Sequence, residues 1–156
     1  MIRIGLISDT HGLLRAEAAD VLRGSDFIVH AGDIGEGVLE PLSTIAPVTA
    51  VRGNNDCAPW GARLNETERL RFGEITLLVL HDLADLATVP KAAGVDVVVT
   101  GHSHCPKIEH RDGVLYVNPG SAGPRRFSLP VSVAVMQIVG HDVNVRIVEL
   151  ESLRTA

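Results

Sequence analysis

The amino-acid sequence predicts an α/β protein in which two β-sheets pack face to face with helices outside. The first half alternates short runs of Val, Ile and Leu with longer amphipathic segments, which is typical of strand–helix–strand units. From residue 106 onward, strand-like runs follow one another across short turns, as in antiparallel hairpins. A chain of 156 residues that is 46% apolar and 21% charged can bury one core, so we expect a single domain over residues 1–156.

Five apolar runs predict buried strands, because strands covered by crossover helices on both sides are apolar on both faces. These runs are residues 2–7, 27–31, 48–51, 75–80 and 95–99. Between them, residues 13–22, 38–45 and 83–93 are expected to form helices, and Pro90 is expected to bend or end the third.

Four further runs, at residues 107–110, 114–117, 131–139 and 143–150, predict two antiparallel hairpins. The first hairpin is joined at Asp112-Gly113 and the second at Gly140-His141-Asp142. The stretch over residues 118–130 is rich in Pro and Gly, and we expect it to be an ordered loop. This loop and the loop over residues 58–68 are expected to determine substrate specificity.

The charge balance disfavours nucleic-acid and membrane partners. Nineteen acidic and fourteen basic residues give a net charge of −5, and aromatic residues make up only 3%. The two cysteines, Cys57 and Cys105, form no disulfide framework, and no basic and apolar leader begins the chain. We therefore expect a reduced cytoplasmic protein in which both cysteines are small buried side chains. The oligomeric state stays open, a homo-oligomer included.

Candidate metal ligands follow all five apolar runs, where the carboxyl ends of strands bind ligands in open α/β sheets. In order, they are Asp9 and His11, Gly32-Asp33, Gly53-Asn54-Asn55-Asp56, His81, and Gly101-His102-Ser103-His104. Each motif alone is also typical of a turn or a helix cap. Their joint occurrence, expected at the same edge of one sheet, indicates a metal site.

The types of these residues indicate which metals would bind. Asp, Asn and His without a pair of cysteines suit Mn²⁺, Fe or Zn²⁺, and of these we expect Mn²⁺, with Ni²⁺ as a further alternative. The candidates exceed what one ion takes, so two ions about 3.5 to 4 Å apart, bridged by a carboxylate, are expected. Two such ions clamp a phosphoryl group and supply a bridging hydroxide for attack on a phosphoester.

As a set, these motifs resemble those of the calcineurin-like metallophosphoesterase superfamily, whose pattern is D-x-H, G-D, G-N-H-D/E, H and G-H-x-H. The short chain and Asn118-Pro119-Gly120-Ser121 further resemble its small bacterial and archaeal phosphodiesterase branch. The resemblance spans residue 4 to about residue 139, and it implies a four-layer αββα sandwich of two mixed sheets. It implies Asp9, His11 and His104 as ligands of one ion, Asn54, His81 and His102 as ligands of the other, and Asp33 as their bridge. Asp33 and Asn54 would act in catalysis, and Asn54 would also touch the phosphate.

The chain departs from the family pattern at two positions. Asn55 stands where relatives have a histidine that acts as general acid, and an amide cannot supply that proton. We therefore expect weak activity on esters with poor leaving groups. Asn55 itself is expected to contact the substrate. Asp82 stands where glycine is usual, and it either caps the next helix or orients His81.

Two further features leave alternatives open. The turn Asn118-Pro119-Gly120-Ser121 either supports the site from beneath or is a plain turn between strands. Arg125 and Arg126 follow this turn, and Arg125 either binds an anionic substrate or is simply solvated.

We expect a dinuclear metal-dependent phosphodiesterase or phosphatase that acts on a small phosphoester. The alternative is a protein-interaction scaffold that kept the fold and lost the chemistry, as in the retromer subunit that the branch resembles. A scaffold would be expected to lose ligands, whereas all seven positions here hold a competent residue type. A nuclease would need a basic surface and aromatic stacking residues, which this composition does not favour.

Overall fold

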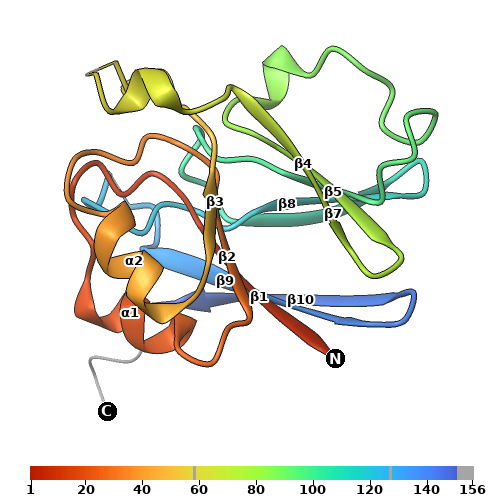
Figure 1. Ribbon diagram of the computed structural model, residues 1–156, viewed down its shortest axis with the longest axis horizontal. Coiled ribbons are helices and arrows are strands. Elements are labelled where there is room, and N and C mark those ends of the chain that lie inside the picture. Colours follow the sequence, from red (N-terminus) through yellow and green to blue (C-terminus); the bar gives the residue numbers. More distant parts are fainter. Residues whose placement is uncertain (58, 127, 151–156) are drawn as a thin grey trace.

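Ten strands form two five-stranded mixed sheets in the computed structural model, which describes residues 1–57, 59–126 and 128–150 (Figure 1). The strands are β1 (Ile2–Ile7), β2 (Phe27–His30), β3 (Val48–Ala50), β4 (Thr67–Phe72), β5 (Ile75–Leu80), β6 (Val97–Val99), β7 (Lys107–Arg111), β8 (Val114–Asn118), β9 (Ser132–Val139) and β10 (Asp142–Glu149). The first sheet has the order β10-β9-β1-β2-β3, and the second has the order β4-β5-β6-β8-β7. The predicted α/β class with two packed sheets is confirmed.

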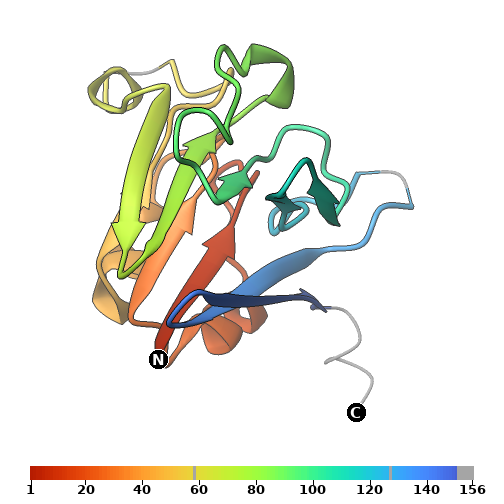
Figure 2. The same cartoon turned by 90° about the vertical axis from the view of Figure 1, so that its right-hand side faces the viewer.

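Parallel pairing of three strands in each sheet brings the ends of these strands to one rim. In the first sheet, β1 pairs in parallel with β2, and β2 pairs in parallel with β3. In the second sheet, β5 pairs in parallel with β6, and β6 pairs in parallel with β8. The predicted hairpins are confirmed as β7–β8 and β9–β10. In Figure 2, β9 (blue) lies beside β1 (red), and β10 (dark blue) forms the edge of the sheet.

The main core lies between the two sheets, because alternate residues of each strand face the opposite sheet. Ile4, Leu6 and Val29 of the first sheet are fully buried against a layer that includes Leu77 and Val79 of the second. This packing fixes the two sheets relative to each other and sets the rim at which the polar strand ends meet.

The outer faces of the two sheets are covered differently. Helices α1 (Ala16–Leu22) and α2 (Leu39–Ile45) cover the first sheet, where Leu22 and Leu42 are buried against Ile28 (Figure 1). The second sheet is covered by the irregular segment of residues 83–94, which packs Leu86 and Ala93 on it. No helix in the described part of the chain is long and apolar enough to span a membrane.

The predicted helix over residues 83–93 is wrong. The structure has only a 3₁₀ turn at Leu83–Asp85, followed by turns. The backbone hydrogen bonds of this 3₁₀ turn join residues three apart, as from Leu86 N–H to the Leu83 carbonyl. Pro90 lacks the amide hydrogen that a continuing helix needs, and Val89 is 70% exposed, so the segment offers no apolar helical face. The first predicted helix also begins later than expected, at Ala16.

Strand β4 is missing from the sequence prediction, which placed the start of this segment in a loop. Only one face of β4 is apolar, through Leu70 and Phe72, and charged residues alternate with them. The strand pairs antiparallel with β5 across a turn at Gly73-Glu74. It lies at the edge of the second sheet, where a half-polar strand is favoured over the continuous apolar run of a central strand.

Candidate metal centre

The predicted ligand residues come together at the rim where strands of both sheets end. Asp9, His11 and His104 form one cluster, and Asp33, His81 and His102 form another. Within each cluster, the ligand atoms lie within 4.8 Å of one another. The expectation that all five strand ends share one sheet edge is wrong, because β1, β2 and β3 belong to the first sheet and β5 and β6 to the second. The site therefore depends on how the two sheets pack.

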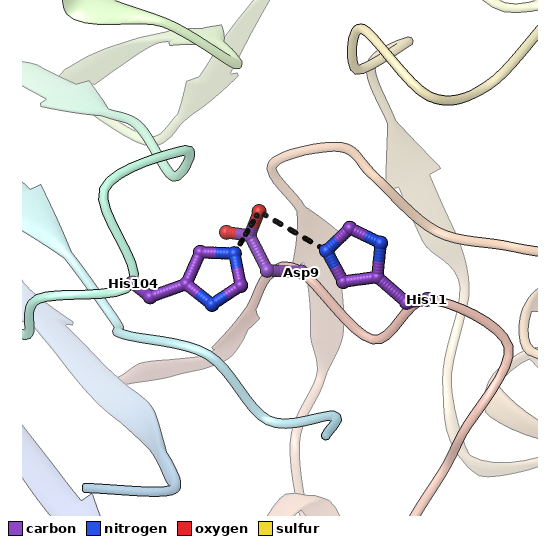
Figure 3. Close-up of side chains that lie close together, drawn as sticks. All are labelled: Asp9, His11 and His104. Atoms are coloured by element: carbon purple, nitrogen blue, oxygen red, sulfur yellow. Dashed lines mark ion pairs between the residues drawn. The ribbon is translucent and has the colours of Figure 1, made fainter. Parts of the chain in front are cut away.

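The first cluster is centred on the Asp9 carboxylate. Its Oδ1 lies 3.3 Å from His104 Nε2 and 3.9 Å from His11 Nε2, and both imidazoles point at it (Figure 3). The other oxygen, Oδ2, accepts hydrogen bonds from the Ser8 hydroxyl at 2.7 Å and from His102 N–H at 3.1 Å. Oδ2 is thereby held by hydrogen bonds, and Oδ1 faces the two histidines without a hydrogen bond.

The second cluster contains Asp33 and a histidine whose tautomer is set by the backbone. His81 Nδ1–H donates to the Ala31 carbonyl at 2.8 Å, so the lone pair of its Nε2 points toward the cluster. Nε2 lies 3.2 Å from Asp33 Oδ2. His102 completes the cluster from the loop after β6, and its ring centroid lies 5.2 Å from that of His81.

Asp33 faces both clusters. Its Oδ2 lies 3.9 Å from His11 Nε2 as well as 3.2 Å from His81 Nε2. Asn55 holds both oxygens of this carboxylate, because its backbone N–H donates to Oδ1 at 2.8 Å and its side-chain amide donates to Oδ2 at 3.0 Å. The Asn55 side chain, predicted to contact substrate, is thus also a hydrogen-bond partner of Asp33.

Buried polar atoms without hydrogen bonds face the space between these residues. Among the described residues they include Asp9 Oδ1, His11 Nε2 and His81 Nε2. A buried polar atom that loses water and gains no partner costs free energy, so such atoms gathered at one place need a ligand. Carboxylate oxygens and imidazole nitrogens are the donor set of Mn²⁺, Fe or Zn²⁺, so the residues present fit divalent cations.

Burial and neighbouring polar groups shift the pKa values of three residues at the site. Burial raises the pKa of Asp33, but the His81 imidazole 3.2 Å away and the hydrogen bonds from Asn55 outweigh it and lower the pKa to about 2. Burial lowers the pKa of His81, but Asp33 and the Ala31 carbonyl outweigh it and raise the pKa. Burial also lowers the pKa of His104, and the nearby charge of Arg126 adds to this. Asp33 is therefore an anion at any pH at which the protein would work.

The backbone at these residues adopts an unusual conformation. Six non-glycine residues among those described have a positive φ angle, and five of them are predicted ligands: Asp9, His11, Asp33, His102 and His104. Their φ angles lie between 46° and 71°, in the left-handed region that is costly for residues with a Cβ atom. The sharp turns this allows point successive side chains back over the strand ends.

Asp56 links two of the ligand loops from below. Its buried carboxylate accepts hydrogen bonds from the backbone N–H groups of Ile34, Gly35 and Gly53, at 2.9 to 3.3 Å. Position 53 requires glycine, because a Cβ atom there would overlap the backbone and carboxylate of Asp33. The sequence placed Asp56 only in the Gly53-Asn54-Asn55-Asp56 motif of candidate ligands, and its hydrogen bonds to backbone amides are visible only in the structure.

The turn Asn118-Pro119-Gly120-Ser121 supports the site from beneath, one of the two alternatives left by the sequence. The Asn118 side-chain amide donates to the Gly101 carbonyl at 2.9 Å and to Ser103 Oγ at 3.1 Å. Ser121 Oγ donates to the Asp9 carbonyl at 3.0 Å. The turn therefore holds the loops that present both clusters.

Replacing Asn118 by alanine is expected to weaken metal binding about tenfold or more, because the loop that carries His102 and His104 loses two hydrogen bonds. Calorimetric titration of chelator-treated protein with Mn²⁺ measures this effect. Asn144→Ala, on exposed β10, is the matched control and is expected to bind as the wild type does. An Asn118→Ala protein that is folded and binds Mn²⁺ as tightly as the control would contradict the role assigned to Asn118.

The remaining predicted residues lie around the clusters. Asn54 is exposed and lines a cavity of about 550 Å³ together with His81 and His102. Arg125 is exposed in the loop after β8, and Arg126 is the neighbour whose charge acts on His104. The prediction that Cys57 and Cys105 are buried is wrong: both are exposed, because each lies in a loop at the rim.

Asp82 caps the 3₁₀ turn, as one of the two alternatives predicted, through a hydrogen bond from Ala84 N–H to its Oδ1 at 3.0 Å. Its other oxygen lies 3.7 Å from His102 Nε2. The imidazole that this carboxylate faces is therefore His102 of the neighbouring loop, and His81 is oriented by Ala31 instead.

Three comparisons with known proteins agree with this geometry. A model of the calcineurin-like phosphoesterase superfamily domain matches residues 2–141. A probable metallophosphoesterase of Methanothermobacter thermautotrophicus is 37% identical, over 93% of this chain and 91% of the relative. Phosphodiesterase YfcE of Escherichia coli strain K12 is 30% identical, over 87% of this chain and 88% of the relative. The solved structure of wild-type Vps29 from Entamoeba histolytica with Zn²⁺ has the same fold, with a TM-score of 0.76 and 22% identity over 96% of this chain and 99% of that one.

The family match spans strands β1 to β9 and every residue of the two clusters. The two curated relatives align over most of their own length, so the likeness extends beyond the short motifs to the whole domain. The sequence motifs, the two-sheet fold and the relatives thus lead to the same assignment, and the chain belongs to the calcineurin-like phosphoesterase superfamily.

Proposed function

We propose that this protein is a dinuclear metal-dependent phosphodiesterase or phosphatase that hydrolyses a small phosphoester. The observation that carries the proposal is the position of Asp33, whose Oδ2 faces a histidine of each cluster at 3.9 and 3.2 Å. A carboxylate so placed is suited to bridge two cations. The names of the relatives as metallophosphoesterase and phosphodiesterase support the same chemistry.

Each of the predicted ligands has a place in this proposal. Asp9, His11 and His104 would hold one ion, and Asn54, His81 and His102 the other, with Asp33 shared between them. When bound, two divalent ions neutralise the charge of a phosphoryl group and activate water for in-line attack near neutral pH. We expect Mn²⁺, and Fe, Zn²⁺ or Ni²⁺ suit the same donors.

The protein's own side chains prepare the site for this reaction. His81 is held with its Nε2 lone pair toward the cluster by the Ala31 carbonyl. Asn55 fixes both oxygens of Asp33 and leaves that carboxylate charged. Asn54 lies on the wall of the adjoining cavity, where its amide can donate to a phosphate oxygen. No proton donor for the leaving group stands at position 55, so the leaving alcohol departs with little assistance from the protein.

Replacing Asn55 by histidine is expected to raise the hydrolysis of alkyl phosphates about tenfold or more, because an imidazole can protonate a poor leaving group. The matched comparison is a p-nitrophenyl ester, whose leaving group needs no proton and whose rate is expected not to rise. The ratio of the two rates, measured for both proteins with Mn²⁺, isolates acid assistance from changes in binding. An unchanged ratio would contradict the role inferred for this position.

The hydrolysis of bis(p-nitrophenyl) phosphate by wild type and Asn54→Ala, both loaded with Mn²⁺, tests the proposed activity. We expect the variant to be slower by about a hundredfold or more, since it lacks both a ligand and a phosphate contact. Equal rates would contradict the place given to Asn54. The structure offers Asn65 as a control for the same substitution, because it is exposed and hydrogen-bonded to Glu68.

A scaffold without catalysis is the second candidate, and the fold shared with Vps29 is the observation that favours it. The complete ligand set argues for the enzyme, because a surface used only for docking places no demand on buried, unpaired ligand atoms. A protein that binds two metal ions and hydrolyses none of a panel of phosphomonoesters and phosphodiesters would favour the scaffold.

A further inference from the structure

Two polar side chains, His30 and Thr10, are fully buried beneath the metal centre. Thr10 lies between Asp9 and His11 in the loop after β1, and β2 ends at His30, shortly before Asp33. Neither residue belongs to either ligand cluster. Because a buried polar group costs free energy unless it is hydrogen-bonded, the partners of these two side chains show what they hold in place.

The hydrogen bonds of the pair run in one direction between the two loops. Gly32 N–H donates to His30 Nδ1 at 3.1 Å, so the ring proton is on Nε2. Nε2–H donates to Thr10 Oγ1 at 3.0 Å, and the Thr10 hydroxyl donates in turn to the Ile34 carbonyl at 2.6 Å. The series of hydrogen bonds therefore begins at one chain neighbour of Asp33 and ends at the other.

Backbone hydrogen bonds join the same two loops. Asp9 N–H donates to the Gly32 carbonyl at 3.0 Å, and His11 N–H donates to the Asp33 carbonyl at 2.9 Å. Asp9, His11 and Asp33 all have positive φ angles, a strained conformation that persists only where the surrounding structure holds it. The side chains of His30 and Thr10 supply part of that support.

The contact with Thr10 extends to a third loop through one peptide group. The carbonyl of Ile34 accepts from Thr10, and the N–H of the same peptide group, that of Gly35, donates to Asp56 Oδ1 at 3.3 Å. Asp56 also accepts from Gly53 N–H in the loop after β3, at 2.9 Å. Hydrogen bonds at both ends of a peptide group polarise and strengthen each other. The three loops are thus held by one connected network.

We propose that His30 and Thr10 are positioning residues of the metal centre, whose hydrogen bonds to the two chain neighbours of Asp33 hold its carboxylate in register with Asp9 and His11. This inference rests on the proposed function, in which two ions share Asp33. A shared carboxylate has to reach both ions at once. A displacement of about 1 Å can lower the rate at such a site by about a hundredfold.

Thr10→Val tests the proposal, because it removes the hydroxyl and nearly keeps the shape of the side chain. Electron paramagnetic resonance of protein loaded with Mn²⁺ reports whether two ions are exchange-coupled through a shared ligand. We expect coupled ions in wild type and weaker coupling in Thr10→Val. We also expect about a tenfold lower kcat for bis(p-nitrophenyl) phosphate, with a smaller change in KM.

Thr10→Ser keeps the hydroxyl, and we expect it to retain both the coupling and the kcat of wild type. Thr76→Val is the matched control for removal of a hydroxyl. Thr76 is also buried, and it lies at the opposite end of β5 from His81. This variant is expected to resemble wild type in both measurements.

Two substitutions of His30 interrupt the network at different points. In His30→Asn, the shorter amide can accept from Gly32 N–H and does not reach Thr10. In His30→Gln, the longer amide can donate to Thr10 and no longer accepts from Gly32. We expect either change to weaken the coupling and to lower kcat about tenfold, as Thr10→Val does.

The outcomes separate this inference from the proposed function. Two bound ions without exchange coupling in wild type would contradict the shared ligand, and absence of hydrolysis by wild type would contradict the enzyme while the coupling still tests the inference. A folded Thr10→Val protein with the coupling and kcat of wild type would overturn the positioning role alone. If Thr10→Val does not fold, wild-type coupling in folded His30→Asn and His30→Gln would overturn it. Reduced stability with unchanged coupling would mean that the pair only stabilises the fold, which also overturns the inference.

Discussion

Replacing Asp33 by asparagine is expected to lower the hydrolysis of bis(p-nitrophenyl) phosphate by more than about a hundredfold. Changes to residues that only orient metal ligands cost about ten- to a hundredfold, and Asp33 is placed as a ligand shared by two ions. The substitution removes the charge that faces His11 and His81, and it turns an N–H₂ group toward one of the two Asn55 groups that donate to this carboxylate. Steady-state rates with saturating Mn²⁺ measure the effect.

Asp112→Asn is a matched control for this experiment. Asp112 is the sixth non-glycine residue with a positive φ angle, and it lies in the turn between β7 and β8, away from both clusters. The same change of side chain in the same backbone conformation is expected to leave the rate unaltered. If Asp33→Asn retained the activity of this control, Asp33 would not be the shared ligand.

Acidification is expected to destabilise the metal-free protein strongly through His30. His30 is fully buried, and burial together with the neighbouring His81 lowers its pKa from 6.5 to about 3. Gly32 N–H donates to its Nδ1 at 3.1 Å, and its Nε2–H faces Thr10 Oγ1 at 3.0 Å, so the ring has no acceptor for a second proton. The folded state therefore keeps His30 neutral.

The direction of the effect follows from the two states. As the pH falls below 6.5, His30 in the unfolded chain takes up a proton while His30 in the folded chain does not, so stability is lost. The loss accumulates until the pH reaches the folded pKa of about 3, and it amounts to roughly 5 kcal/mol over this interval. Above pH 6.5 the contribution of His30 is fully present.

Urea unfolding at several pH values between 7 and 4, with chelator present, measures this loss. The free energy of unfolding of wild type is expected to fall as the pH falls, and His30→Gln is expected to show a smaller slope. Some slope stays in the variant, because the pKa of His104 is lowered as well. His141→Gln, in the exposed turn after β9, should follow wild type, and equal slopes in all three proteins would contradict the assignment to His30.

Much of the fold and the site could be predicted from the sequence, because both depend on strongly patterned residues. Continuous apolar runs located β1, β2 and β5 to within a residue, since central strands are buried on both faces. The polar residues directly after these runs then fell at the strand ends, which is where the structure brings Asp9, Asp33 and His81 together. A pattern of apolar residues along the chain is sufficient to locate a strand when both faces of that strand are buried.

The parts that could not be predicted depend on contacts between distant segments. Asp56 accepts hydrogen bonds from two loops, and Asn118 reaches the loop of His102, and neither partner can be identified by spacing along the chain. Edge strand β4 lacks a continuous apolar run, and residues 83–93 have helix-forming composition but form two separate turns, one ending at Leu86 and one beginning at Val89. Local composition does not resolve these cases, because tertiary packing decides them.

Restoration of activity by metal is the most direct test of metal-dependent phosphoester hydrolysis by this protein. Protein stripped with a chelator and then titrated with Mn²⁺ is assayed on bis(p-nitrophenyl) phosphate while bound metal is counted. We expect no hydrolysis by stripped protein and full hydrolysis once about two ions are bound per chain. Folded protein that takes up two ions and gains no activity on this ester, or that is equally active without metal, would contradict it.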